Sequence, residues 1–111
     1  MEGQFFNYFT EFNRLKQFGL SQTEVDMFQY INTMCLNSKD SKCWCTNEQF
    51  ADLFVITKRQ VQKCIEKLIN LGLIERKIVK GINGFDTRYV KSIEKNAIDM
   101  IRGVVEDVKK E

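Results

Sequence analysis

The fold of this chain is decided between residues 46 and 69, where the sequence reads TNEQFADLFVITKRQVQKCIEKLI. Two capping boxes start eleven residues apart in this stretch, at Thr46 and at Thr57, each with a glutamine three residues later. In a capping box the hydroxyl accepts a hydrogen bond from the third following residue, whose side chain reaches back to the cap. The sequence therefore predicts two helices, ending near Phe54 and near Leu71. Apolar residues at helical spacing predict their buried faces: Phe50, Ala51 and Phe54 in the first, and Val61, Cys64, Ile65 and Leu68 in the second.

A β-hairpin is predicted directly after the second helix. Gly72 suits the left-handed residue that ends a helix. Apolar residues predict a strand over 73–79, residues 81–84 a tight turn rich in glycine and asparagine, and residues 87–93 a return strand. Two helices, a turn and this hairpin together predict a helix-turn-helix with a wing, in a mainly α fold with a small β-hairpin.

The turn between the two helices departs from the usual pattern. Ala51 supplies the small side chain that is needed where the helices cross. The turn position that usually holds glycine is Val55, and a β-branched residue tolerates a positive φ badly. We therefore expect a turn that is built differently or that carries strain.

The alternation of side chains along a strand predicts the orientation of residues in two further segments. Residues 43–45, Cys-Trp-Cys, predict a single short strand with Trp44 turned inward. On the return strand of the hairpin, Tyr89 is expected on the face opposite Arg88 and Val90.

Helices are expected on both sides of this central unit, which spans residues 20–93. Residues 1–19 form an aromatic-rich extension in which a helical stripe competes with a strand over 5–9, and Gly19 supplies the stop. A capping box at Ser21 opens a helix with a buried stripe of Val25, Phe28, Ile31 or Asn32, and Cys35 or Leu36. Residues 94–111 form a last helix with an apolar edge of Ala97, Ile98, Ile101, Val104 or Val105, and Val108.

Length and composition predict one globular domain. The 111 residues are 43% hydrophobic and 29% charged, and proline is absent. No run of about 18 apolar residues could span a membrane, and the N-terminus lacks the basic and apolar regions of a signal peptide. The expected location is therefore the cytoplasm, away from membranes.

Cysteines and catalytic residue types predict neither a metal site nor an enzyme. The four cysteines, Cys35, Cys43, Cys45 and Cys64, lack the paired spacing of a zinc site, so we expect packing residues without disulfides. The chain has no histidine, no glycine-rich phosphate loop and no recognisable pair of catalytic carboxylates. We expect a protein without a cofactor that is not an enzyme.

The excess of basic over acidic side chains is confined to the second helix and the hairpin. Residues 57–91 carry nine basic and three acidic side chains, whereas residues 1–56 carry four and seven and residues 92–111 carry four and five. A charge cluster alone is more often a solvated face. Here it coincides with a helix and a wing of the size that contacts duplex DNA, so the sequence favours a phosphate-facing surface.

Residue types on this surface indicate how DNA would be read. Arginine pairs with guanine and glutamine with adenine near the start of such a helix, and later lysines contact phosphates. The recognition helix is expected at about 57–71 and the basic wing at about 74–92. The predicted DNA-binding residues are Thr57, Lys58, Arg59, Gln60, Gln62, Lys63, Lys67, Arg76, Lys77, Lys80, Asn83 and Arg88.

Residues 20–93 resemble the winged helix-turn-helix superfamily. The Leu-Ser-x-x-Glu start at Leu20, the segment Thr-Asn-Glu-Gln-Phe-Ala from Thr46, and Leu-Gly-Leu-Ile from Leu71 are similar to the N-terminal domains of bacterial, phage and plasmid replication initiators. MarR-like regulators are the next most similar. The resemblance implies origin or operator binding through Lys58, Arg59, Gln60, Gln62, Lys63, Arg76, Lys80 and Arg88.

Three functional interpretations follow from the sequence. The first is sequence-specific binding of double-stranded DNA in replication initiation, with replication or transcription proteins as partners. The second is a small transcriptional regulator that binds operator DNA, and the third is a winged helix that binds proteins. Initiators normally continue into a second domain, so the chain is either a piece of such a protein or a stand-alone binder. Apolar stripes on the terminal segments predict a homodimer.

Overall fold

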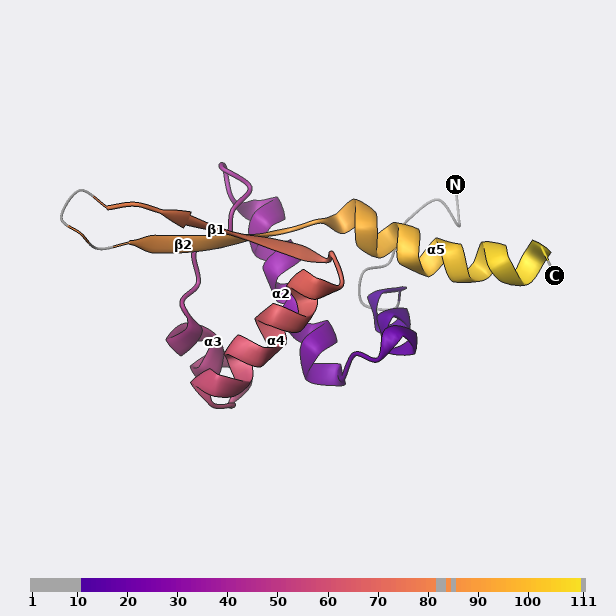
Figure 1. Cartoon of the computed structure of the whole chain (residues 1–111), viewed down its shortest axis with the longest axis horizontal. Coiled ribbons are helices and arrows are strands. Elements are labelled where there is room, and N and C mark those ends of the chain that lie inside the picture. The colour runs from indigo at the N-terminus through magenta and orange to yellow at the C-terminus, as the bar shows by residue number, and fades with distance from the viewer. Residues whose placement is uncertain (1–10, 82–83, 85, 111) are drawn as a thin grey trace.

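The computed structural model describes residues 11–81, 84 and 86–110, and of residues 104–110 it describes only the backbone. Four α-helices, one 3-10 helix and two strands occur in this part of the chain. In order they are η1 (Phe12–Phe18), α2 (Gln22–Asn37), α3 (Asn47–Phe54), α4 (Lys58–Asn70), β1 (Ile74–Val79), β2 (Thr87–Ser92) and α5 (Glu94–Lys110). Figure 1 shows the hairpin and α5 extending in opposite directions, with α3 and α4 on one side of the hairpin. This is the layout of a winged helix-turn-helix.

All three predicted capping boxes are confirmed. The side-chain hydroxyls of Ser21, Thr46 and Thr57 each accept a hydrogen bond from the backbone N–H of the residue three positions later. The side chain of that residue in turn accepts from the backbone N–H of the cap. The helices α2, α3 and α4 begin directly after these residues. Each box satisfies two of the backbone donors that a helix start leaves without partners, which explains why local sequence was sufficient to place the starts.

The end of α4 and the hairpin also form as predicted. Gly72 has a φ of 77°, and its backbone N–H donates to the carbonyl of Ile69 at 2.9 Å. The N–H of Leu73 donates to the carbonyl of Leu68 at 2.9 Å, which completes a Schellman motif. The two strands then pair antiparallel, with Ile74 opposite Ser92 and Val79 opposite Thr87.

The prediction for Trp44 is wrong. Cys43, not Trp44, is turned inward: Cys43 is fully buried and forms an isolated bridge with Val90, whereas Trp44 is 44% exposed. Alternation then places Trp44 on the outer face with Tyr89, and their ring centroids lie 5.1 Å apart. The backbones of Cys43 and Val90 exchange two hydrogen bonds of 2.9 Å, and these bonds hold Cys43 beneath the hairpin with its side chain in the core.

The N-terminal extension differs in part from its prediction. The described part is a 3-10 helix, Phe12–Phe18, that ends at Gly19 with a φ of 91°, as expected for a left-handed stop. Phe12 is fully buried, and its ring lies 5.0 Å from the ring of Phe28. The competing strand over residues 5–9 lies outside the described residues.

One core combines these elements. The predicted stripe of α2 is buried at Val25, Phe28, Ile31, Asn32 and Cys35, whereas Leu36 is 59% exposed. Buried residues from α3, α4, the hairpin and the start of α5 complete it, including Phe50, Val61, Ile65, Leu68, Leu73, Ile74, Val90, Ala97 and Ile101. No helix among the described residues is long and apolar enough to cross a membrane.

A buried polar link fastens the start of α5 to this core. The Asn32 amide is 3% exposed; it donates to Oε2 of Glu94 at 2.8 Å and accepts from the hydroxyl of Ser92 at 2.6 Å. The Asn96 amide also donates to the carbonyl of Gly72 at 2.7 Å. Because buried polar groups are costly to leave without partners, these bonds determine where α5 begins relative to α2 and the hairpin.

Candidate nucleic-acid interface

The helix α4 has one buried and one exposed face. Val61, Cys64, Ile65 and Leu68 pack into the core, as predicted. The opposite face carries four exposed side chains with donor groups: Lys58, Arg59, Gln62 and Lys63. Within the described part of the chain none of the four forms an ion pair or a side-chain hydrogen bond with another residue. Their charged and amide groups therefore face solvent and are available to a ligand.

Thr57 and Gln60 are exposed but serve the helix start. The Thr57 hydroxyl accepts from the Gln60 backbone N–H at 3.1 Å, and Oε1 of Gln60 accepts from the Thr57 backbone N–H at 2.9 Å. A glutamine that reads adenine needs both its oxygen and its nitrogen. Gln60 offers only its nitrogen while the cap is formed, so Gln62 is the better placed of the two.

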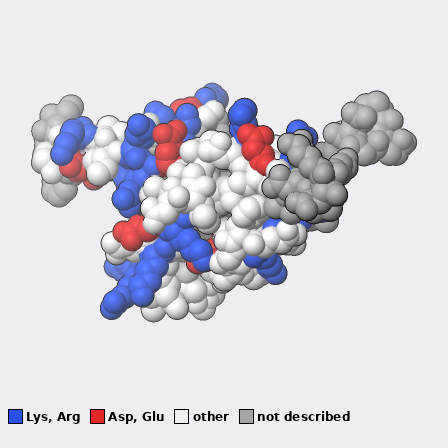
Figure 2. All heavy atoms as spheres, turned by 45° about the vertical axis from the view of Figure 1, so that its right-hand side comes forward, with Lys and Arg blue, Asp and Glu red and all other residues white. Residues whose placement is uncertain are grey.

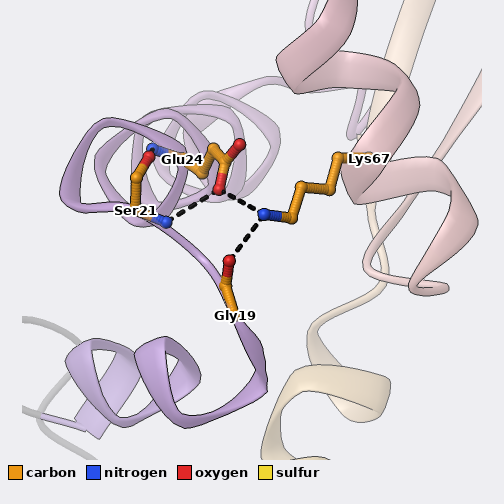
Figure 3. A network of polar contacts seen from close by, with 4 residues as sticks. All are labelled: Gly19, Ser21, Glu24 and Lys67. Carbon is orange, nitrogen blue, oxygen red and sulfur yellow. Dashed lines mark hydrogen bonds and ion pairs between the residues drawn. The ribbon is translucent and has the colours of Figure 1, made fainter.

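Lys67 points away from the exposed face of α4. Its ammonium donates to the carbonyl of Gly19 at 2.5 Å and forms an ion pair with Glu24 at 3.0 Å, as Figure 3 shows. The same carboxylate oxygen accepts from the backbone N–H of Ser21 at 2.7 Å. Lys67 therefore joins α4 to the start of α2, and its predicted contact with DNA stays a prediction.

The charge state of Glu24 depends on this network. Burial alone would raise the pKa of the Glu24 carboxyl, but the hydrogen bonds from Ser21 and the contact with Lys67 together lower it below the ordinary value of 4.5. The carboxylate therefore stays ionised and continues to accept from Lys67 in mildly acidic solution.

A groove of about 340 Å³ separates α4 from the inner face of the hairpin. It is lined by Asn47, Gln62, Ile65, Arg76, Ile78 and Arg88. The guanidinium of Arg88 is held at this groove by two hydrogen bonds, in which Nη2 donates to the carbonyl of Cys45 at 3.2 Å and to the side-chain oxygen of Asn47. Burial lowers the pKa of Arg88, and the nearby charge of Arg76 adds to that effect. Two like charges at the groove favour an anion between α4 and the wing.

The remaining wing residues separate onto different faces. Arg76 shares the inner face with Val90, whereas Lys77 is paired with Tyr89 on the outer face and does not line the groove. Lys80 near the hairpin tip forms an ion pair with Asp86 at 3.3 Å, although its side chain is 85% exposed. An exposed pair of this kind is weak and exchanges readily for a phosphate. The predicted contact at Asn83 lies outside the described residues.

Basic side chains gather over the hairpin and near the turn that precedes α4. Figure 2 shows one group of Lys and Arg along the hairpin and a second group at the lower left, with uncharged and acidic surface between them.

The turn between α3 and α4 carries strain at Val55. Its φ of 56° and ψ of 50° are left-handed, and its side chain is 88% exposed. The next N–H, that of Ile56, donates to the carbonyl of Ala51 at 3.0 Å, so the backbone follows the usual glycine turn without the glycine. The alternative of a strained turn is thus confirmed.

The cysteines are free thiols. Cys35, Cys43 and Cys64 are buried and Cys45 is partly buried. Burial raises the pKa of the Cys43 thiol to about 11 and that of Cys64 to about 12, so both stay protonated at neutral pH. Among the described residues, no group of three or more His, Cys, Asp or Glu side chains could hold a metal ion.

Comparison with known proteins supports the fold. No family model matches the chain, and no curated protein matches it significantly. Among solved structures it is similar to one described as a possible transcriptional regulator from Methanosarcina mazei Go1. The TM-score is 0.65 at 18% identity, and the match covers 88% of this chain and 78% of that chain. At this identity the similarity concerns the fold.

Proposed function

We propose that this chain binds double-stranded DNA, with α4 in the major groove and the wing on the adjacent backbone. The observation that carries the proposal is the exposed face of α4, where Lys58, Arg59, Gln62 and Lys63 have no partner among the described residues while the opposite face is buried. Arg59 and Gln62 would read base edges, because their groups match guanine and adenine. Lys58 and Lys63, together with Arg76 and Lys80, would contact phosphates.

Among the biological roles considered for this binding, we propose transcription regulation. The similar solved structure is described as a possible transcriptional regulator, which favours the operator-binding interpretation. The role in replication initiation rests on the sequence resemblance from Leu20 to Ile93 and stays a prediction. A winged helix that binds proteins would not need unpaired basic groups on both α4 and the wing.

A change at Arg59 tests base reading. A duplex selected from a random library would be titrated with the unchanged protein and with Arg59→Ala. The variant is expected to bind the selected site about 10- to 100-fold more weakly, because a bidentate contact contributes about 1–3 kcal/mol of discrimination. Binding to unrelated duplexes should fall much less.

Changes at Lys58 and Lys63 test phosphate contact. Each Lys→Gln variant should weaken binding to every duplex and reduce the salt slope by about one. Lys95→Gln is the matched control, because Lys95 is exposed on α5 and its charge is removed in the same way. If Arg59→Ala and both lysine variants behave like Lys95→Gln, the proposal is wrong.

We further propose a homodimer that presents two α4 helices to adjacent half-sites. The support is the position of α5, which leaves the domain on the side opposite the hairpin and packs against η1 near its start (Figure 1). Ala97 and Ile101 are already buried in the core of the single chain, and it is the apolar pattern continuing to Val108 in the sequence that a second α5 would cover. Sedimentation that shows only monomer at high micromolar protein would contradict the dimer.

A further inference from the structure

The outer face of the hairpin carries an aromatic pair surrounded by lysines. In the antiparallel register Lys77 is opposite Tyr89, and Glu75 is opposite Lys91, so these four side chains share one face. Trp44 joins them from the neighbouring segment, with its ring 5.1 Å from that of Tyr89 and tilted by 58°. We call this surface the outer hairpin face: Lys42, Trp44, Glu75, Lys77, Tyr89 and Lys91.

The aromatic pair is held in place by specific contacts. The ammonium of Lys42 lies 4.6 Å from the centre of the Tyr89 ring and 5.8 Å from that of Trp44. The indole N–H of Trp44 donates to Oδ2 of Asp40 at 3.0 Å. Hydrogen bonds from Ser38 and Trp44 lower the pKa of Asp40, so this acceptor stays ionised. The rings are therefore oriented before any ligand arrives.

Core packing does not account for this surface. Trp44 is 44% exposed, and neither Trp44 nor Tyr89 belongs to the hydrophobic core or to the partly buried residues packed against it. A large aromatic side chain in water forgoes the burial that usually stabilises it. Fixed rings with nearby cations on a sheet face are instead the arrangement that binds unpaired bases by stacking and their phosphates by charge.

We propose that the outer hairpin face binds single-stranded DNA. Bases would stack on Trp44 and Tyr89, while Lys77 and Lys91 would contact the phosphates. The inference rests on the proposed function in one respect only: if the protein binds duplex DNA, then DNA is the nucleic acid whose unpaired strands come near this face. It concerns a separate site, because α4 and the groove lie on the other side of the hairpin (Figure 1).

An acidic peptide fits this face less well. The three lysines are accompanied by Glu75 on the same face and by Asp40 beside the indole, so the local charge is only weakly positive. Charge alone would hold an acidic chain weakly at ordinary salt. Stacking on an oriented ring is the stronger contribution, and it requires a ligand with flat aromatic groups such as bases.

Trp44 is the only tryptophan of the chain, so its fluorescence reports directly on this face. We would titrate the protein with an eight-nucleotide oligothymidylate and expect saturable quenching. Binding of a labelled copy, followed by anisotropy, should weaken about tenfold or more in Trp44→Leu and in Tyr89→Leu. Trp44→Phe keeps a ring and should retain most of the affinity. Thermal unfolding of each variant would verify that the hairpin still folds.

Control ligands separate this site from the duplex site. Arg59→Ala should lose affinity for the selected duplex but keep the affinity for labelled oligothymidylate measured by anisotropy. Trp44→Leu, which has no tryptophan to quench, should keep the duplex affinity and lose the anisotropy-measured affinity for oligothymidylate. Quenching without any duplex binding would contradict the proposed function and leave this inference standing. Absence of quenching at millimolar oligonucleotide would overturn the inference. Equal affinity for polyglutamate would overturn it in favour of an acidic peptide, and tighter binding of oligouridylate would overturn the choice of DNA.

Discussion

Replacing Val55 by glycine should stabilise this protein. Val55 occupies the left-handed turn of the helix-turn-helix with a φ of 56°, a region that residues other than glycine rarely adopt. Its side chain is 88% exposed, so the turn obtains little burial in return for the strain. Glycine has no Cβ and adopts this backbone conformation freely.

The size of the effect follows from three contributions. Relief of the left-handed conformation contributes about 1–2 kcal/mol for an ordinary residue, and a β-branched residue should be at the upper end. Glycine makes the unfolded chain more flexible, which costs about 0.4–1 kcal/mol. The small part of the valine that is buried contributes about 0.3 kcal/mol. The expected net increase in the free energy of unfolding is about 1 kcal/mol, or about 4–6 °C in Tm for a domain of this size.

Urea unfolding and a thermal melt of Val55→Gly would measure this change. The matched control is Val55→Ala, which removes the same exposed methyl groups but keeps a Cβ; we expect a change of less than about 0.5 kcal/mol. Equal stability of the two variants would show that strain at Cβ is not the cause. A glycine variant less stable than the unchanged protein would refute the reasoning altogether.

Two further predictions concern the polar contacts that link distant elements. Because the folded-state pKa of Glu24 is lowered, its ionised form contributes stability above the ordinary pKa of 4.5 that is lost as pH falls through the folded-state value. Glu24→Gln and Lys67→Met should both flatten the acid side of the curve of Tm against pH, and an unchanged curve would contradict the network. Asn32→Ala should lower the free energy of unfolding in urea by about 2–3 kcal/mol, because it leaves Ser92 and Glu94 without their buried partner. The neighbouring exposed Thr33→Ala should change it by less than about 0.5 kcal/mol, and equal effects would show that the buried link is unimportant.

Much of the fold could be predicted because its signals are local. The capping boxes at Ser21, Thr46 and Thr57 connect residues three apart, and the stops at Gly19 and Gly72 depend on the backbone of one residue. Helical spacing likewise placed the buried face of α4, which in turn defined the exposed residues Lys58, Arg59, Gln62 and Lys63. These features join residues that are close in sequence, so they do not depend on how distant parts of the chain are packed.

The candidate site was predicted less completely because some of its side chains have distant partners. Lys67 contacts Gly19, 48 residues away, and Arg88 contacts Asn47, 41 residues away. The sequence predicted Lys67 and Arg88 as DNA-binding residues, since no residue close to them in the sequence indicates these distant partners. Gln60 differs, because the capping box that occupies its side-chain oxygen is itself a local signal in the sequence.

Sequence alone thus determined the helix starts, the hairpin and the basic composition of residues 57–91, since short-range hydrogen bonds and periodicity specify them. Only the tertiary structure decided which basic groups stay available to a ligand. It also turned Trp44 outward, because the bridge between Cys43 and Val90 sets which face of that segment meets the core. The physical reason is that a local pattern states which side chains alternate, whereas packing between distant segments decides which of the two faces is buried.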